Sequence, residues 1–477
     1  MRIYNTLTKT KEELPKSEPV GIYVCGITPY DYSHVGHGRV YVLWDVFRRY
    51  FTYRGYQVKY VQNFTDIDDK IIAKAKEEGA EPQEVAERYI EDFLKVMDQL
   101  GVRKADIYPK VTDHISEVIE VVEGLLEKGH AYVVEGESGS DVYFDLESFP
   151  EYGKLSGRCL ADLEAGARVE VDSRKRNPMD FALWKAAKEG EPAWDSPWGP
   201  GRPGWHIECS AMALKYLGTN FTIHGGGSDL VFPHHENEIA QSECYTGQPF
   251  AKVWVHNGFV QVRGEKMSKS LGNFFTIRDV LREFSPRALR YFLISTHYRK
   301  PLSYSEEELT MAERSLERLT TAREQLRLFL EKKPQGETSL PLASLEEALQ
   351  KIKDDFTAAM DDDLNTAGAL ASLHELATLT NKTIAQLTTP SQEELDFLRK
   401  LEETFSSLGD EVLGLWDPVE AEEDDAQVEP LLELILELRT KARSKRDWET
   451  ADFIRDRLGE LGYKIEDTPE GPRWKRS

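Results

Sequence analysis

The sequence is poor in cysteine and in long apolar segments, and each shortage excludes a class of protein. Its four cysteines show no CxxC spacing, so they do not indicate a disulfide framework. No run of about 18 apolar residues is present, and the first residues lack the pattern of a signal peptide. We therefore expect a cytoplasmic protein without a membrane partner.

Positive charge is also in short supply. The 477 residues include 60 basic and 84 acidic side chains, which gives a net charge of −24. Because affinity for phosphate needs cations, any contact with nucleic acid must depend on local basic patches. A hydrophobic content of 40% favours a globular protein, with roughly two to four domains at this length.

The first hundred residues have the pattern of an α/β fold. Residues 21–25 form a short apolar run, which predicts a buried strand. A helix is predicted from about His37 to Gly55, and a second strand at 57–62 completes a right-handed βαβ unit. Segments that follow such strands lie at the carboxyl edge of the sheet, where open parallel sheets bind ligands.

Two short motifs give the clearest indication of chemistry. His34, Gly36 and His37 follow the first strand at the mouth of the predicted helix, where imidazole and backbone donors suit an anion. Far downstream, Lys266 and Lys269 lie in the sequence Lys-Met-Ser-Lys-Ser, and paired lysines in a flexible loop suit an oligophosphate. Taken alone, the second motif also fits a solvated basic turn.

A glycine-rich segment and an acidic segment are further candidates at the same edge. A strand is predicted at 221–224, followed by a loop at 225–229 that contains Gly227 and ends in Asp229. Such a loop suits a ribose held by a carboxylate, and a flexible turn is the alternative. The acidic cluster at 63–70 fits either a site or a solvated helix cap.

A metal site is compatible with the residues but is not established by them. His234 and Glu238 lie one helical turn apart, and His235 with Glu238 is an equally acceptable pair. Cys25 ends the first strand and Cys209 follows the insertion, so both can reach the same sheet edge. The alternative is that both cysteines are small buried apolar side chains.

The second half of the chain has a different organisation. Residues 111–200 are predicted to be an insertion within the core, and apolar residues recur at helical spacing over 309–329. Helical sequence continues to about residue 416 and includes the acidic motif 360–366, which we interpret as structural. An acidic linker at 417–430 then precedes a small terminal module.

The terminal module combines basic and aromatic residues. A hairpin is predicted from Tyr463 to Trp474, and basic residues with exposed aromatics suit phosphate contact and base stacking. A solvated charged helix is the alternative. The candidate RNA contacts are Arg439, Lys441, Arg443, Lys445, Arg446, Trp448 and Trp474.

The paired histidine and lysine motifs resemble the signature of class I aminoacyl-tRNA synthetases. Over nearly its whole length the chain is similar to the cysteinyl-tRNA synthetase family of the bacterial type. The motifs that carry this resemblance are 23–28, 63–70, 176–181, 204–212, 224–241 and 266–273. The histidine motif differs only in having Val35 where isoleucine is more usual.

This resemblance implies an α/β fold with a Rossmann-type catalytic core. The implied parts are the core at 1–110 and 201–260, a connective insertion at 111–200, a signature-loop and stem-contact region at 261–308, a helical bundle at 309–416, the linker at 417–430, and a mixed α/β anticodon-binding module at 431–477.

The resemblance also assigns roles to individual residues. It implies one Zn²⁺ per chain, which would read the thiol of L-cysteine, and a second substrate, ATP with Mg²⁺. The implied residues are Cys25, Cys209, His234 and Glu238 for the metal; His34, His37, Lys266 and Lys269 for catalysis; Gly36, Gly227, Asp229 and Lys269 for the nucleotide; and Thr65, Trp205 and His224 for the pocket.

The implied activity is the formation of a cysteinyl adenylate and its transfer to tRNA(Cys) by a monomer. Two other functions compete with it. A related ligase transfers the same adenylate to the amine of a sugar-inositol, but it lacks a tRNA-reading tail, which residues 427–477 supply here. A non-catalytic tRNA-binding paralogue would be expected to lose signature residues, whereas all four are present.

Overall fold

The computed structural model describes residues 1–14, 19–136, 139–158, 174–262, 264–267, 274–335, 337–416, 425–460, 462–468 and 471–476. The chain divides into two compact units, Met1–Trp416 and Asp417–Ser477. In the described ranges, no helix has both the length and the apolar character needed to cross a membrane.

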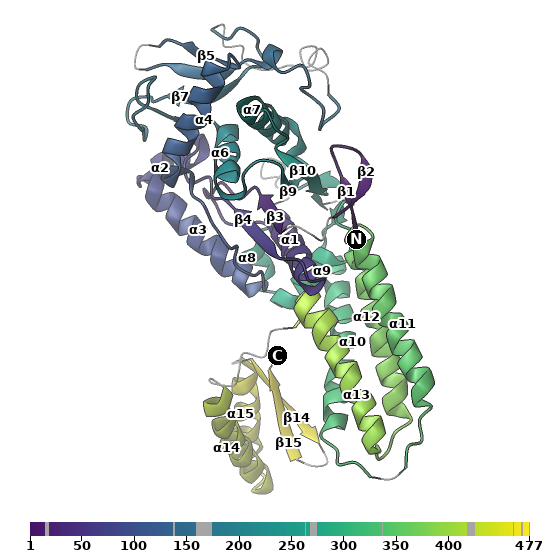
Figure 1. Ribbon diagram of the computed structural model, residues 1–477. Coiled ribbons are helices and arrows are strands. Elements are labelled where there is room, and N and C mark those ends of the chain that lie inside the picture. The colour runs from purple at the N-terminus through teal and green to yellow at the C-terminus, as the bar shows by residue number, and fades with distance from the viewer. Residues whose placement is uncertain are drawn as a thin grey trace. The chain divides into compact units, whose positions relative to one another are not determined.

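A parallel four-stranded sheet forms the centre of the first unit (Figure 1). Its order is β10 (Ala251–Asn257), β9 (Phe221–Gly227), β3 (Val20–Val24) and β4 (Val58–Gln62). From β3 the chain moves to β4 on one side, and from β9 it moves to β10 on the other. The carboxyl ends of β3 and β9 therefore flank a topological switch point, the usual ligand-binding position in such sheets.

Helices cover both faces of this sheet. His224 of β9 points toward α7 (Glu236–Thr246), which packs beside α6 (Trp205–Leu217). The next residue, Gly225, points toward α1 (Val35–Tyr53), because successive side chains of a strand alternate between faces. A Cβ atom at Gly225 would lie 1.8 Å from the ring of Trp44, so glycine allows α1 to approach closely.

Two sequence predictions about these elements were wrong in detail. The helix predicted to begin near His37 begins at Val35, because His34 provides the N-terminal cap. The predicted loop at 225–229 is strand as far as Gly227, so these glycines serve close packing and not a turn. The strand predicted at 221–224 is confirmed as the first part of β9.

The remaining elements before the bundle connect and cover the sheet. They are β1 (Arg2–Asn5), β2 (Thr10–Glu13), α2 (Asp69–Glu78), α3 (Pro82–Gln99), η1 (Val111–Asp113), α4 (Ile115–Glu127), η2 (Leu146–Ser148), η3 (Val231–His235), β11 (Val260–Val262), β12 (Glu265–Lys266), α8 (Ile277–Val280), α9 (Pro286–Ile294) and β13 (Leu302–Ser303).

The predicted insertion at 111–200 and the residues just after it form a sheet that the sequence did not reveal. Strands β5 (Ala131–Val134), β6 (Asp141–Phe144), β7 (Phe181–Ala186) and β8 (Gly201–Pro203) pair antiparallel in that order. The strands are short and three of them are far apart in the sequence, so no alternating run indicated them.

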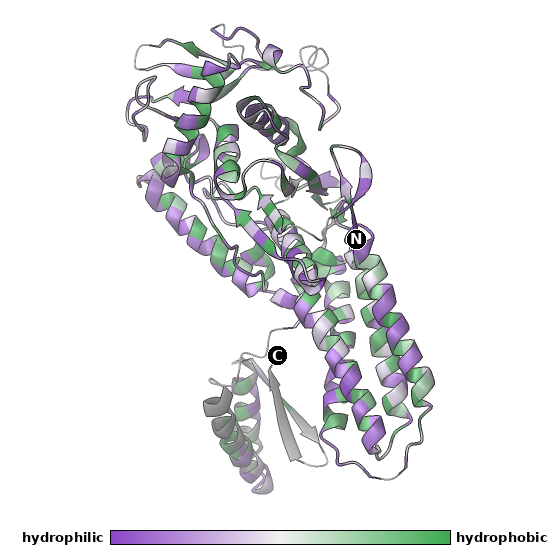
Figure 2. Ribbon diagram, viewed as in Figure 1, coloured by the Kyte–Doolittle hydropathy of each residue, from purple (hydrophilic) through white to green (hydrophobic). Residues whose placement is uncertain are grey.

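A helical bundle follows the sheet region. Its helices are α10 (Glu306–Leu330), α11 (Leu342–Asp361), α12 (Thr366–Ala385), α13 (Gln392–Thr404) and η5 (Phe405–Leu413). Leu309, Leu316, Leu319 and Leu326 of α10 are buried, which confirms the predicted amphipathic helix. Figure 2 shows polar and apolar residues on each of these helices.

The second unit contains two helices and a hairpin. These elements are α14 (Asp425–Ser444), α15 (Trp448–Glu460), β14 (Tyr463–Thr468) and β15 (Gly471–Arg476), and the predicted hairpin is confirmed. The predicted linker at 417–430 is shorter than expected, because α14 already begins at Asp425. Acidic residues favour the first turn of a helix, so part of the acidic run is helical.

Candidate active site and metal centre

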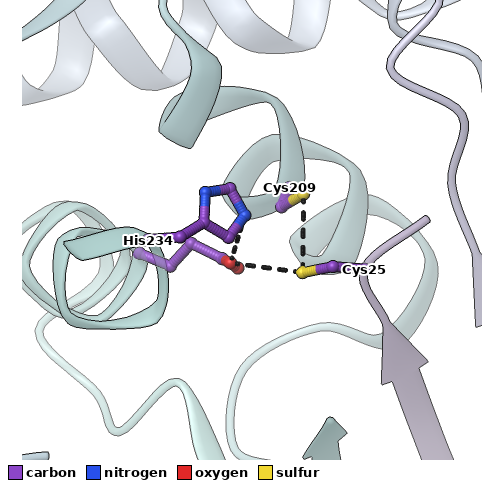
Figure 3. A group of neighbouring side chains, drawn as sticks. Cys25, Cys209 and His234 are labelled. Atoms are coloured by element: carbon purple, nitrogen blue, oxygen red, sulfur yellow. Dashed lines mark hydrogen bonds and ion pairs between the residues drawn. The ribbon is translucent and has the colours of Figure 1, made fainter. Parts of the chain in front are cut away.

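Four potential metal ligands, one from a loop and three from helical elements, converge beside the switch point (Figure 3). Cys25 follows β3, Cys209 lies in α6, His234 in η3 and Glu238 in α7. Cys25 Sγ is 3.9 Å from Cys209 Sγ and 3.6 Å from Glu238 Oε1. His234 Nε2 is 3.0 Å from the same carboxylate oxygen. The structure thus brings all four predicted residues together in a buried cluster.

The geometry of this cluster suits a tetrahedral metal ion. The four ligand atoms lie within 4.8 Å of one another. In a tetrahedral site with metal–sulfur bonds of about 2.3 Å, two sulfurs lie about 3.8 Å apart. The observed Sγ–Sγ distance of 3.9 Å between Cys25 and Cys209 is close to that value.

The electrostatics of the cluster also favour a cation. Burial lowers the pKa of His234, but the facing Glu238 carboxylate and the Cys209 sulfur together outweigh this effect and raise that pKa to about 10. Burial opposes ionisation of Glu238, yet the imidazoles of His224 and His234 lower its pKa to about 2. A hydrogen bond from Cys25 lowers the pKa of Cys209 to about 6. A metal ion would supply the positive charge that the proton on His234 otherwise provides.

A second set of ligands overlaps the first. Cys25, His224, His235 and Glu238 also bring their ligand atoms within 4.8 Å of one another. His235 Nε2 is 3.3 Å from Cys25 Sγ and 3.9 Å from Glu238 Oε1. Geometry alone therefore leaves open the choice between His234 and His235, as the sequence did.

Two of the three predicted pocket residues, His224 and Trp205, contact the ligands of this cluster. His224 is fully buried, its Nε2 is 2.8 Å from Glu238 Oε2, and its ring stacks on Trp254 at 4.5 Å. Trp205 is 41% exposed and stacks on His234 at 4.5 Å, so it forms a solvent-facing wall. Thr65 is buried beside the carboxyl edge of β4.

The histidine motif forms a reciprocal cap at the start of α1. The His37 amide donates to His34 Nδ1 at 3.2 Å, and the His34 amide lies 3.4 Å from His37 Nδ1. The two rings stack at 3.7 Å, and burial together with the neighbouring His34 lowers the pKa of His37 well below its usual value. A Cβ atom at Gly36 would lie 2.8 Å from His34 Nδ1. Glycine is therefore needed for this arrangement of donors at a helix N-terminus.

The lysine motif lies partly outside the described residues. The backbone of Lys266 belongs to β12, whereas Lys269 is outside the described ranges. The chain that follows returns to the histidine motif, where the Val35 amide donates to the Phe275 carbonyl at 3.1 Å. A Cβ atom at Gly36 would also lie 4.0 Å from Met267 Cε, so the described part of the lysine motif lies beside the histidine motif.

The predicted nucleotide residues after β9 lie at the same sheet edge. Gly227 ends β9, and Asp229 is exposed two residues farther along the chain. A Cβ atom at Gly227 would lie 2.4 Å from Asp229 Oδ1, so the carboxylate folds back over the strand end.

The predicted RNA contacts do not share one environment. Lys441, Arg443, Lys445 and Arg446 are exposed, and Trp448 is 55% exposed. Arg439 is buried at 5% exposure, and it therefore differs from the exposed cations. Trp474 belongs to β15, and only its backbone is described.

The sequence did not reveal two histidines beside the ligands. His206 Nδ1 lies 2.9 Å from His234 Nδ1, and His256 Nε2 lies 2.7 Å from His235 Nδ1. His206 is next to Trp205 within the motif at 204–212, so its position in the sequence could have indicated a place near the ligands. His256 ends an apolar strand, and nothing in its local sequence distinguishes it from a packed core residue.

Known proteins resemble this chain in sequence and in fold. The family "tRNA synthetases class I (C) catalytic domain" matches residues 12–314, and the DALR domain family matches residues 355–417. A methionyl-tRNA synthetase from Mycobacterium tuberculosis, solved with methionyl-adenylate, has a TM-score of 0.62 over 83% of this chain and 92% of its own. Its sequence identity is 16%, so it supports the fold alone.

Relatives with much higher identity match the whole chain. A cysteine–tRNA ligase from Moorella thermoacetica is 54% identical over 100% of both chains, and one from Carboxydothermus hydrogenoformans is 53% identical over the same shares. A third, from Thermococcus onnurineus, is 50% identical over 100% of this chain and 99% of its own. The chain therefore belongs to the cysteine–tRNA ligase family of class I tRNA synthetases.

Proposed function

We propose that this enzyme holds one Zn²⁺ through Cys25, Cys209, His234 and Glu238, and that this ion selects the substrate. L-Cysteine would react with ATP to give cysteinyl adenylate and pyrophosphate, and the cysteine would then pass to the 3′-terminal ribose of tRNA(Cys). The buried cluster of two thiols, an imidazole and a carboxylate is the observation that carries the proposal.

His234 is the preferred histidine because it completes the ligand set that includes both buried thiols. It lies beside Cys209, whereas the alternative set omits that buried thiol although it is 3.9 Å from Cys25. An imidazole partner does not separate the two candidates, because His234 Nδ1 is 2.9 Å from His206 Nδ1 just as His235 Nδ1 is 2.7 Å from His256 Nε2. Partners of this kind orient metal ligands and are important for affinity.

Selection between cysteine and serine explains why a metal is useful here. The two amino acids differ in one atom, and a pocket that reads shape separates such near-isosteres only about a hundredfold. When bound, zinc would supply a borderline-soft electrophile that accepts the substrate thiolate as a further ligand but holds a hydroxyl poorly. Trp205 and His224 would then orient the amino acid beside the ligands.

The signature motifs would act on the triphosphate. The substrate carboxylate attacks the α-phosphorus of ATP, and pyrophosphate leaves as negative charge spreads toward it. His34, His37, Lys266 and Lys269 would stabilise this charge together with Mg²⁺. Gly36 and Gly227 would allow close approach of the nucleotide, and Asp229 would hold its ribose.

The remaining parts would handle tRNA. We propose that the enzyme is a cytoplasmic monomer, that the bundle orients the tRNA, and that the terminal unit reads its anticodon. Lys441, Arg443, Lys445 and Arg446 would contact phosphates, and Trp448 would stack on an unpaired base. Arg439 is left out because it is buried.

The assignment is tested by cysteine-dependent exchange between ATP and pyrophosphate, followed by charging of tRNA that carries a GCA anticodon. Both activities are expected, and serine should support neither. Exchange without charging, combined with transfer to a sugar-inositol amine, would contradict the tRNA assignment. Absence of exchange from a folded, metal-loaded protein would contradict the proposed chemistry.

Truncation after Trp416 should separate activation from charging. The cut lies at the boundary between the two units, and every residue proposed for activation lies before it. We expect nearly wild-type pyrophosphate exchange, with weaker charging whose dependence on salt is reduced.

The full-length variant Trp448→Ala provides the control for this truncation, because it removes one exposed ring and leaves the unit in place. It should raise the KM for tRNA and leave exchange unchanged. Equal loss of exchange and charging in a folded truncation would show that the units do not divide the work in this way.

A further inference from the structure

Three consecutive aspartates at the turn between α11 and α12 bind three different parts of the catalytic region. Asp361 Oδ1 accepts a hydrogen bond from the Tyr50 hydroxyl of α1 at 2.7 Å. Asp362 pairs on the surface with Arg2 and Lys11. Asp363 contacts residues 297–299, which follow α9. The acidic motif interpreted as structural is thus a joint between the bundle and the core.

Asp363 is the buried member of this joint. Its Oδ1 accepts hydrogen bonds from the Tyr298 hydroxyl at 2.7 Å and from the Tyr4 amide at 2.8 Å, and its Oδ2 accepts one from Arg299 Nε at 2.8 Å. Its φ is +68°, and that of Leu364 is +52°. Two successive non-glycine residues in the left-handed region persist only where their surroundings hold them firmly.

The segment held by Asp363 in turn holds Arg39, two residues after the signature histidine His37. Arg39 is fully buried, and its guanidinium donates only to backbone carbonyl groups among its recorded hydrogen bonds. These five bonds, at 2.7–3.4 Å, go to Gly258, Leu293, His297, Tyr298 and Lys300. The position of the first turn of α1 therefore depends on the path of residues 297–300.

The same segment supports the lysine motif. The Gly258 amide donates to the Tyr298 carbonyl at 2.8 Å, and β11 then pairs in parallel with β13. Strand β12, which contains Lys266, pairs with β11, and the Met267 amide donates to the Val260 carbonyl at 3.1 Å. One short segment therefore supports both signature motifs from the side of the bundle.

We infer that Asp363 is a positioning residue for cysteine activation, because it fixes the segment 297–300 on which the histidine and lysine motifs both rest. It is fully buried and acts through Tyr298, Arg299 and the carbonyls that hold Arg39. A misplacement of about 1 Å at reacting groups can cost roughly 100-fold in rate, so a small shift of this segment is sufficient. The inference rests on the roles proposed above for the two motifs.

The test compares Asp363→Asn with Asp362→Asn in the full-length enzyme. Asparagine tolerates the left-handed region, so the first variant removes the charge without changing the backbone preference. We expect Asp363→Asn to lower the kcat of pyrophosphate exchange roughly 10- to 100-fold with little change in the KM for cysteine. Asp362→Asn removes the same charge from a residue whose ion pairs with Arg2 and Lys11 lie on the surface, and this variant should retain the wild-type kcat. Metal content should be unchanged in both, which separates this result from a failure of the zinc proposal.

A double-mutant cycle distinguishes positioning from a merely structural role. Arg39 and Asp363 do not touch, so independent effects of Arg39→Lys and Asp363→Asn on kcat would multiply. If both residues act through the same segment, the kcat of the double variant should fall by much less than the product of the two single fold-reductions. Tyr298→Phe removes a single hydroxyl and should also lower kcat. It replaces Asp363→Asn in this test if that variant does not fold. Wild-type kcat in a folded Asp363→Asn or Tyr298→Phe enzyme, or a fully multiplicative cycle, would overturn the inference.

Discussion

Replacement of Cys209 by serine is expected to reduce cysteine activation more than roughly 100-fold. Loss of even an outer partner of a metal ligand typically costs about 10- to 100-fold in affinity or activity, and Cys209 is a proposed direct ligand. Serine keeps nearly the same size, so the change removes a thiolate without creating a large cavity. The loss should appear mainly as a higher KM for cysteine and as reduced metal content.

Cys244→Ser is the matched control for this prediction. Cys244 is in α7, the helix beside α6, but it lies outside the ligand cluster and is only partly buried. It should keep full metal content and wild-type exchange. ATP binding should be similar in both variants, because the nucleotide motifs lie elsewhere at the sheet edge. Wild-type selectivity for cysteine in a metal-free Cys209→Ser enzyme would contradict the assignment of this ligand.

Lys269→Ala is expected to slow adenylate formation by about 2 to 4 kcal/mol in activation free energy, the usual cost of removing one preorganised partner of developing charge. The charge to be stabilised spreads toward pyrophosphate only in the transition state, so kcat for exchange should fall more than the affinity for ATP. Pre-steady-state measurement of adenylate formation gives the chemical step directly.

Lys382→Ala tests whether any loss of one positive charge has this effect. Lys382 is exposed on α12 of the bundle, and its removal should leave exchange unchanged. Equal rates of adenylate formation in Lys269→Ala and wild-type enzyme would show that Lys269 does not act in activation.

Much of the catalytic fold could be predicted because the local patterns of apolar residues match the faces that are buried in the structure. The apolar run at 21–25, the helix after it and the strand at 57–62 correspond to β3, α1 and β4. The insertion sheet could not be predicted, since its strands are short and β7 pairs with strands that are distant from it in the sequence. The start of α1 was missed because histidine is an uncommon cap, and here a second histidine completes it.

The candidate site shows the same division between local and long-range information. Spacing placed His234 and Glu238 on one side of a helical segment, but it could not bring Cys25 and Cys209 within 3.9 Å of each other. That proximity depends on the order of β3 and β9 in the sheet, which is a property of the whole chain. The role of Asp363 was hidden for the same reason, since its partners at 297–299 are distant in sequence.

The most direct test of the account is a spectrum of the enzyme in which Co²⁺ replaces zinc. Sulfur meets a borderline-soft metal ion directly, whereas the oxygen of serine must compete with water at the same position. Addition of L-cysteine should produce a new thiolate-to-cobalt charge-transfer band, and addition of L-serine should not. The same band with both amino acids, or with neither in an enzyme that still rejects serine, would show that the metal does not read the substrate thiol.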